Sequence, residues 1–128
     1  MTKRQIVTSS APAAMAVYSQ AIDAGGFVFC AGQIGLDPVS GELAEGLQAQ
    51  AERALRNLEG VLDAAGLSLA DVVKTTCFLA DIGDFQAFNE VYARFFSETP
   101  PARSTFAVGA LPRGARIEVE AIAAHPSV

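Results

Sequence analysis

The stretch Val72-Val73-Lys74-Thr75-Thr76-Cys77-Phe78-Leu79 decides the fold class of this 128-residue chain. Its length and its β-branched and aromatic residues are typical of a strand. Strict alternation places Val73, Thr75, Cys77 and Leu79 on one face and Val72, Lys74, Thr76 and Phe78 on the other. Apart from Lys74 and the threonines neither face is polar, and strands that are apolar on both faces belong to sheets covered on both sides. We therefore expect a covering layer on each face of a sheet.

Two segments have the period of amphipathic helices. In 46–65 the apolar residues recur at steps of three and four, and in 84–96 five aromatic residues form a second stripe. Asp81 or Asp84 is the candidate N-cap of the second helix, and Pro100-Pro101 follows its end. Both stripes are typical of helices that cover a sheet.

Five further short runs have the character of strands and span 6–8, 18–24, 27–31, 104–108 and 116–123. Gly25-Gly26, between two of them, is a hairpin signal. The chain is predicted to be one α+β domain, residues 1–128, with a mixed sheet and two helices on one face. Because two helices cover only one face of such a sheet, we expect the other face to be a subunit interface.

The composition agrees with self-association. Hydrophobic residues make up 51% of the chain and charged residues 18%, and the mean hydropathy is +0.30. A membrane span needs about 20 consecutive apolar residues, and no uninterrupted run of that kind is present. The formal net charge of −5 has the wrong sign for binding a phosphate backbone. We therefore expect neither a membrane nor a nucleic acid as partner.

The cysteines and the histidine limit the chemistry. Cys30 and Cys77 each lie in an apolar run, as expected for free core thiols in a reducing compartment. The N-terminus has no apolar signal segment. We therefore predict a cytoplasmic protein. His125 is the only histidine, and its place near the C-terminus predicts a frayed surface residue. No metal site and no Ser/Cys-His dyad is expected.

Two kinds of charged residue remain as candidates for a site. Arg103 follows Pro100-Pro101 at the entry to a strand, where its guanidinium is suited to receive a carboxylate. Its alternative is a salt bridge to Glu118 or Glu120, which point to one side of an otherwise apolar strand. Glu120 is the candidate for positioning or deprotonating a water, whereas we expect Glu118 to be solvated. Gly32 ends a strand and permits close approach of a ligand to the backbone, or forms a plain turn.

A set of motifs across nearly the whole chain resembles the RidA/YjgF family of reactive-intermediate deaminases. The motifs are Ala11-Pro12-Ala13-Ala14, Tyr18-Ser19-Gln20-Ala21, Gly32-Gln33-Ile34, Val73-Lys74-Thr75-Thr76, Asp84-Phe85, Asn89, Pro101-Ala102-Arg103-Ser104 and Ile117-Glu118-Val119-Glu120-Ala121-Ile122-Ala123. The resemblance implies a chorismate-mutase-like α+β protomer and a homotrimeric barrel, with the helices outside and the active sites in clefts between subunits.

The resemblance also implies an activity, the hydrolysis of 2-aminoacrylate and other 2-imino acids to 2-oxo acids and ammonia, without cofactor or metal. Arg103 would bind the substrate carboxylate and Glu120 would hold the attacking water. Tyr18 would line the cleft from the neighbouring subunit, Gly32 would offer its backbone to the ligand, and Asn89 falls at a position that the family usually keeps near the pocket. Three positions depart from the familiar pattern: Ala31 stands where many members have Ser, Thr105 where many have Cys, and Val17 where Pro is common. Thr105 still offers a hydroxyl, so a water site is kept. Ala31 removes one polar contact, which affects substrate range and rate more than the fold.

Other functions stay open on sequence grounds. A non-enzymatic trimer that binds small carboxylates, as a sensor or protein partner, would use the same residues. RNA cleavage, a name often attached to this family, is disfavoured by the acidic charge and by the absence of a catalytic histidine. A chorismate mutase is an alternative at the level of fold alone, because its site would need more than one cation in the cleft.

Overall fold

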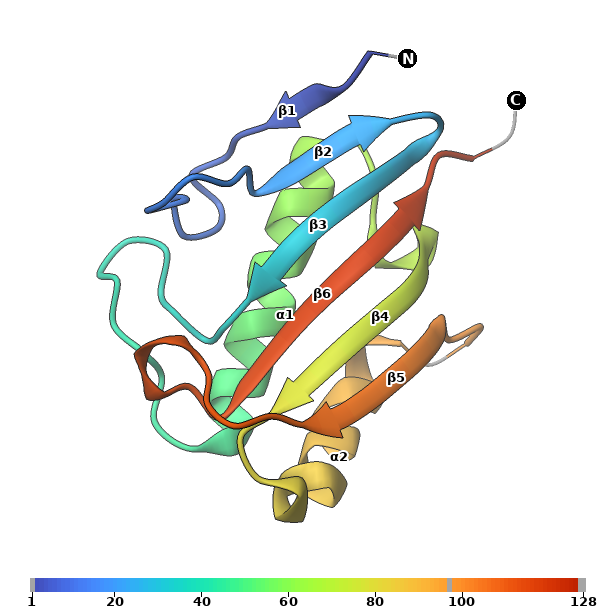
Figure 1. Cartoon of the computed structure of the whole chain (residues 1–128). Helices are drawn as coiled ribbons and strands as arrows, with labels where there is room; N and C mark the ends of the chain where they lie inside the picture. Colours follow the sequence, from blue (N-terminus) through green and yellow to red (C-terminus); the bar gives the residue numbers. More distant parts are fainter. Residues whose placement is uncertain (1, 97, 127–128) are drawn as a thin grey trace.

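The sheet is mixed and has six strands in the order β1-β2-β3-β6-β4-β5, as the computed structural model of the chain shows (Figure 1). The structure describes residues 2–96 and 98–126. The strands are β1 (Arg4–Ile6), β2 (Ala21–Ala24), β3 (Phe27–Gln33), β4 (Val72–Leu79), β5 (Ala102–Ala107) and β6 (Ile117–Ala124). All neighbours pair antiparallel except β4 and β5, which are parallel. The predicted mixed α+β architecture is confirmed.

Two helices cover one face of this sheet. Helix α1 (Leu47–Ala64) packs against β3 and β6, and α2 (Phe85–Phe95) packs beside α1 (Figure 1). The core between the layers is apolar and includes Leu55, Leu58, Leu62, Val28, Cys77, Leu79, Phe88, Ile117 and Val119, all nearly or fully excluded from solvent. None of the helices among the described residues is long and apolar enough to span a membrane.

The second face of the sheet has no covering layer among the residues that the structure describes. It carries Phe27, Phe29 and Phe106, each more than 40% exposed, and Phe106 packs edge-on against Phe78 at a centroid distance of 5.3 Å. Lys74, also on this face, donates to Ser104 Oγ at 3.2 Å. The expectation that the two helices leave one apolar face uncovered is confirmed.

A β-bulge corrects the predicted alternation of β4. Val72 pairs with Ala123 of β6 and Lys74 with Ile122, so the register shifts at Val73. Because the bulge gives β4 one extra residue there, Val72 is buried and Val73 is 46% exposed, although strict alternation placed Val73 with the buried Thr75.

The segment before β2 is a loop rather than the predicted start of a strand. Gln20 is buried, and its side-chain amide donates to the carbonyl oxygens of Thr8, Ala11 and Pro12 while its oxygen accepts from Thr8 N–H at 2.8 Å. These contacts hold the loop folded, so β2 begins at Ala21 and Tyr18 stays outside it.

His125 is better ordered than the sequence suggested. Its Nε2 lies 3.0 Å from Asp23 Oδ2, and its backbone N–H donates to the carbonyl of Gly26 at 2.9 Å. Asp23 also accepts from Arg4 at 3.0 Å, so charges from β1 and β2 and from the residue after β6 meet at one end of the sheet.

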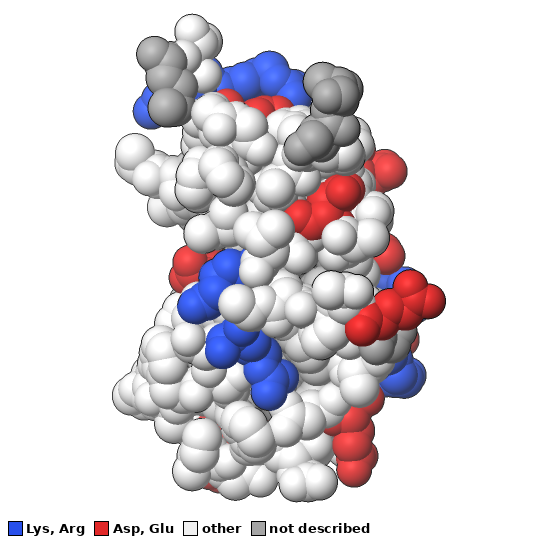
Figure 2. Space-filling view, turned by 90° about the vertical axis from the view of Figure 1, so that its right-hand side faces the viewer, with Lys and Arg blue, Asp and Glu red and all other residues white. Residues whose placement is uncertain are grey.

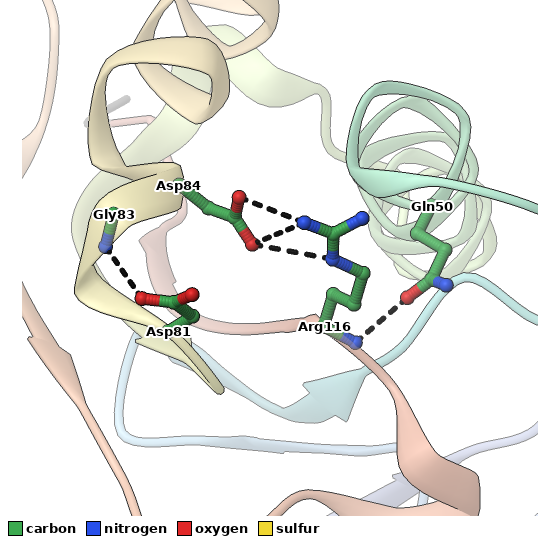
Figure 3. Close-up of polar contacts among 5 residues, drawn as sticks. All are labelled: Gln50, Asp81, Gly83, Asp84 and Arg116. Carbon is green, nitrogen blue, oxygen red and sulfur yellow. Dashed lines mark hydrogen bonds and ion pairs between the residues drawn. The ribbon is translucent and has the colours of Figure 1, made fainter.

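The starts of α2 and β6 are joined by polar contacts (Figure 3). Arg116 donates to both carboxylate oxygens of Asp84 at 2.8–3.2 Å, and its backbone N–H donates to Gln50 Oε1 of α1 at 2.8 Å. Asp81 caps the short turn before α2 by accepting from Gly83 N–H at 2.8 Å. Asp84 occupies the N-cap position of α2 without a side-chain cap, because its carboxylate pairs with Arg116 instead.

Candidate active site

A cavity of about 520 Å³ opens between the loop that contains Tyr18, the end of β3 and the turn that precedes β6. Its wall is mostly apolar and consists of Pro12, Ala13, Met15, Ala16, Tyr18, Ala31, Gly32, Gln33, Ile34, Leu36, Pro112, Arg113 and Glu118. We call it the Glu118 pocket, because Glu118 is its only acidic residue. The structure thus places Tyr18 and Gly32 at one pocket of a single chain, whereas the resemblance implied that Tyr18 lines the cleft from the neighbouring subunit.

Gly32 lies directly against the carboxylate of Glu118. A Cβ at position 32 would collide with Glu118 Oε2, so only glycine lets the carboxylate approach the backbone of β3 this closely. Burial, and to a smaller extent the charge of Glu120, raise the pKa of Glu118 above its ordinary value. Glu118 is therefore a half-buried carboxylate held at a backbone surface.

Glu120, the sequence candidate for the water site, lies outside this pocket. It is exposed on the uncovered face of the sheet, where it pairs with Thr76 of β4. The resemblance gave the water to Glu120, and Glu118 was expected to be solvated, which is wrong because Glu118 is half-buried in the pocket. Both glutamates share one face, so alternation alone cannot tell which of the two meets Gly32. The register of β3 against β6 decides this, and it shifts at an irregularity between Cys30 and Gln33. The role of Glu120 at the water site stays a prediction. The glutamate that lines the pocket beside Gly32 is Glu118.

Arg103 lies at the opposite edge of the sheet, on the face that the helices cover. In the β4–β5 register it lies beside the buried Thr75. Its guanidinium carbon lies over the rings of Tyr92, Phe85 and Phe88, with centroid distances of 4.7, 5.7 and 5.9 Å. The salt bridge to Glu118 or Glu120 that the sequence left open is not formed, and within residues 2–96 and 98–126 Arg103 has no ion pair.

Two buried polar atoms accompany Arg103. Thr105 follows it on the same face, opposite Cys77, and Asn89 lies on α2 beside Phe88. Thr105 Oγ1 and Asn89 Oδ1 are buried and have no hydrogen-bond partner among the described residues. Such atoms are uncommon in folded proteins and point to a missing ligand or neighbour. We call Arg103, Thr105, Asn89 and the three rings the Arg103 cluster.

The sheet separates the two groups. Thr105 and Arg103 face the helix layer, whereas Glu118 faces the uncovered side, opposite Phe78 of β4. Figure 2 looks onto the side of the molecule that carries β5, where Lys and Arg side chains gather near the middle of the view. Of the residues predicted to share a cleft, one chain thus brings together Tyr18 and Gly32, and separately Arg103, Thr105 and Asn89.

The described residues show no metal centre and no reactive thiol. In that part of the chain, no three His, Cys, Asp or Glu side chains are grouped as metal ligands. Both cysteines are free and buried, as predicted, and burial raises the pKa of Cys30 to about 12 and that of Cys77 to about 11. Protonated thiols are poor nucleophiles and poor metal ligands.

Comparison with known sequences places these features in a family. Residues 8–125 match the family model described as Endoribonuclease L-PSP. The chain is 50% identical over 126 residues to the protein DfrA of Myxococcus xanthus, with 96% of each chain covered. It is 49% identical over 122 residues to the 2-iminobutanoate/2-iminopropanoate deaminase of Rattus norvegicus, with 94% of this chain and 89% of the rat protein covered.

Solved structures agree with the sequence comparison. RidA from an Antarctic Psychrobacter species superposes with a TM-score of 0.92 at 45% identity, covering 94% of this chain and 98% of that one. The YjgF gene product of E. coli superposes with a TM-score of 0.93 at 41% identity, covering 96% and 99%. With nearly full coverage on both sides, the resemblance seen in the motifs is confirmed, and the chain belongs to the RidA/YjgF family.

Proposed function

We propose that this protein hydrolyses reactive 2-imino acids, such as 2-aminoacrylate, to 2-oxo acids and ammonia, in sites formed between subunits. The observation that carries the proposal is the separation of the Arg103 cluster from the Glu118 pocket within one chain. Each region has part of what an imino-acid site needs. The Arg103 cluster offers a cation that can bind the substrate carboxylate, and the Glu118 pocket offers a glutamate beside the backbone of β3. The similarity to deaminases from rat and human supports the reaction.

A homotrimer accounts for both the separation and the uncovered face. A head-to-tail contact between copies closes into a ring when its rotation fits, and each contact then joins two different surfaces. In such a ring the Arg103 cluster of one subunit would meet the Glu118 pocket of the next, which gives one complete site per interface. The exposed Phe27, Phe29 and Phe106 would be removed from water in the same assembly.

The proposed reaction is simple. Arg103 binds the substrate carboxylate through its planar fork of N–H donors. An enamine such as 2-aminoacrylate first takes up a proton at C3 and becomes the protonated imine. Glu118 accepts a proton from a water molecule whose oxygen forms a bond to the imine carbon, giving a neutral carbinolamine. Glu118 returns that proton to the nitrogen, the C–N bond breaks with its electron pair on nitrogen, and ammonia leaves as the hydroxyl proton passes to Glu118 and the C=O bond forms.

The polar atoms without partners complete the proposed site. Thr105 Oγ1 and Asn89 Oδ1 are available to the substrate or its water, and the backbone at Gly32 and the ring of Tyr18 border the cleft. Imines of this kind hydrolyse unaided, so a few kcal/mol from placement and charge suffice, where about 1.4 kcal/mol is tenfold in rate. We assign the water to Glu118 in place of Glu120, because only Glu118 lines the pocket.

A carboxylate-binding protein without catalysis is the second candidate. It is favoured by the Arg103 cluster, which presents a cation with no ion pair among the described residues. Ammonia release distinguishes the two candidates. The imino acid is generated in situ by an amino-acid oxidase, and semicarbazide competes for it. Faster loss of the imine with protein present supports catalysis, and an unchanged rate together with bound 2-oxo acid supports the second candidate.

Mixing two inactive variants tests the shared site. Arg103→Ala and Glu118→Gln are each expected to be inactive, with Glu120→Gln as the matched control that keeps activity. If a site combines Arg103 of one subunit with Glu118 of its neighbour, random mixed trimers regain about one quarter of the parent activity, because one in four interfaces has both intact residues. Mixed trimers that stay inactive, with subunit exchange verified by mass spectrometry, would contradict the shared site.

A further inference from the structure

The guanidinium of Arg103 is surrounded by aromatic rings rather than by acids. Tyr92, Phe88 and Phe85 all belong to α2, and the centroid of Tyr92 lies nearest to it, at 4.7 Å. A cation over an aromatic ring is attracted by the negative face of the ring without being neutralised. The rings therefore support Arg103 and leave its charge available to a ligand.

Tyr92 differs from the other two rings because its hydroxyl is fixed. Tyr92 OH lies 2.8 Å from Thr75 Oγ1, and both side chains are buried. Thr75 in turn is the residue of β4 directly beside Arg103 in the register with β5. The three residues form a closed arrangement, in which strand pairing joins Arg103 to Thr75, a hydrogen bond joins Thr75 to Tyr92, and the ring of Tyr92 supports Arg103.

We propose that Tyr92, locked by Thr75, is a positioning residue that holds the guanidinium of Arg103 in the orientation that receives the substrate carboxylate. An arginine side chain is long and loses rotamer freedom when it binds, so a support that orders it beforehand favours binding. This inference rests on the proposed function for the identity of the ligand. It goes beyond that function in giving a buried tyrosine and a buried threonine a role in affinity.

Phe96 supplies a matched control within the same group of rings. It packs on Tyr92 at a centroid distance of 4.7 Å and is buried to the same degree, 8% exposed against 6%. Phe96 makes no cation–π contact with Arg103 among the described residues. Replacing either ring by leucine removes similar packing, but only one replacement removes the support of Arg103.

The test compares KM, kcat and the calorimetric dissociation constant of 2-oxobutanoate in four single variants and one double variant. Tyr92→Leu is expected to raise KM and the dissociation constant about tenfold, with a smaller effect on kcat. Phe96→Leu is expected to lower the melting temperature while both constants stay at the parent values. Tyr92→Phe and Thr75→Val each break the same hydrogen bond, so each is expected to raise KM about threefold, and the double variant no further.

Three outcomes would overturn the inference. The first is a folded Tyr92→Leu protein with parent KM and dissociation constant, and the second is a Phe96→Leu protein whose binding is weakened as much as that of Tyr92→Leu. If Tyr92→Leu does not fold, the cycle of Tyr92→Phe and Thr75→Val decides, and the third outcome is unchanged constants in both of these single variants. Calorimetry separates this inference from the proposed function, because a parent protein that binds 2-oxobutanoate but releases no ammonia contradicts only the latter.

Discussion

The Arg103 cluster and the Glu118 pocket hold opposite charges by opposite means. Arg103 is supported by side chains, three aromatic rings from α2, and lies under the helix layer. Glu118 lies on the uncovered face, where its carboxylate lies against the backbone of Gly32. It can lie there because glycine has no side chain that would occupy the same space. A long, weakly hydrated cation gains from an apolar support, whereas burial beside the strand disfavours the charged form of the Glu118 carboxyl and raises its pKa. The difference teaches that each charge is prepared independently, before any second subunit is present.

Removing the cation is expected to have the largest effect. Arg103→Ala should lower kcat/KM by about 100-fold or more, because a charge-assisted, two-pronged contact to the substrate is lost. Arg103→Lys should recover part of the loss, since it restores the charge without the planar fork. The melting temperature and the oligomeric state should change little, as Arg103 makes no ion pair in the described part of the chain. An Arg103→Ala enzyme with the parent rate would refute the assignment.

Filling the space beside the anion should have the next largest effect. Gly32→Ala places a methyl group on the carboxylate of Glu118, which must then move, so kcat is expected to fall about tenfold. Gly109→Ala is the matched control, because a Cβ there meets nothing within 4 Å. Steady-state kinetics of both variants check this, and equal kinetics for the two would mean that the contact between Gly32 and Glu118 has no role in the reaction.

The pH dependence should distinguish the two glutamates. Activity is expected to fall as the pH drops through the raised pKa of Glu118, because protonation removes the base. Glu120→Gln removes the neighbouring negative charge and should shift this acid limb to lower pH without loss of the plateau rate. A pH–rate profile of parent and variant measures the shift, and an acid limb that moves the other way would contradict the electrostatic assignment.

The same raised pKa has a consequence for stability. A carboxyl group whose pKa is higher in the folded state favours folding below its unfolded pKa, and this contribution is lost as the pH rises through the folded value. Glu118→Gln is therefore expected to unfold at a higher temperature than the parent at neutral pH, with the difference shrinking in acid. Thermal melts at several pH values test this, and a Glu118→Gln protein that is less stable at neutral pH would show that burial is not the dominant effect.

Thr105→Val should have the smallest effect. The Thr105 hydroxyl is buried without a partner in the described chain, so its removal should leave stability unchanged or slightly improved. Affinity for a 2-oxo acid should fall by only about two- to fivefold, through one lost hydrogen bond. Calorimetry and thermal melts together check both signs, and a strongly destabilised variant would mean that the hydroxyl already has a partner in the free protein.

Much of the fold could be predicted, because regular elements follow from periodicity. The stripes of α1 and α2 and the alternation in β6 are properties of the chain itself, and the apolar second face of β4 correctly indicated a missing layer. The loop around Tyr18 could not be predicted, since it depends on one buried side chain, Gln20, that binds three distant carbonyl groups.

The candidate site was predicted less completely. Arg103, Tyr18 and Gly32 followed from motifs, but the choice between Glu118 and Glu120 depends on the irregular register of β3 against β6 between Cys30 and Gln33. A register shift of this kind changes which residue of β6 lies beside a given residue of β3. An alternating sequence pattern does not reveal such a shift. The rings beneath Arg103 were interpreted as core, which holds for Phe88 and Tyr92 but not for Phe85, which is 37% exposed. The support that we propose they give to Arg103 is visible only when the distances to the guanidinium are known.

The ion pair between Asp84 and Arg116 links the segment before the Arg103 cluster to the segment before Glu118. Asp84 immediately precedes Phe85, which borders Arg103, and Arg116 lies two positions before Glu118. If Arg103 and Glu118 of one chain belong to different clefts of a ring, this ion pair connects two adjacent catalytic centres rather than stabilising one of them. A substitution at either residue would then disturb two centres for every altered subunit, and an organism carrying one normal and one altered copy of the gene would lose more than half of its working sites.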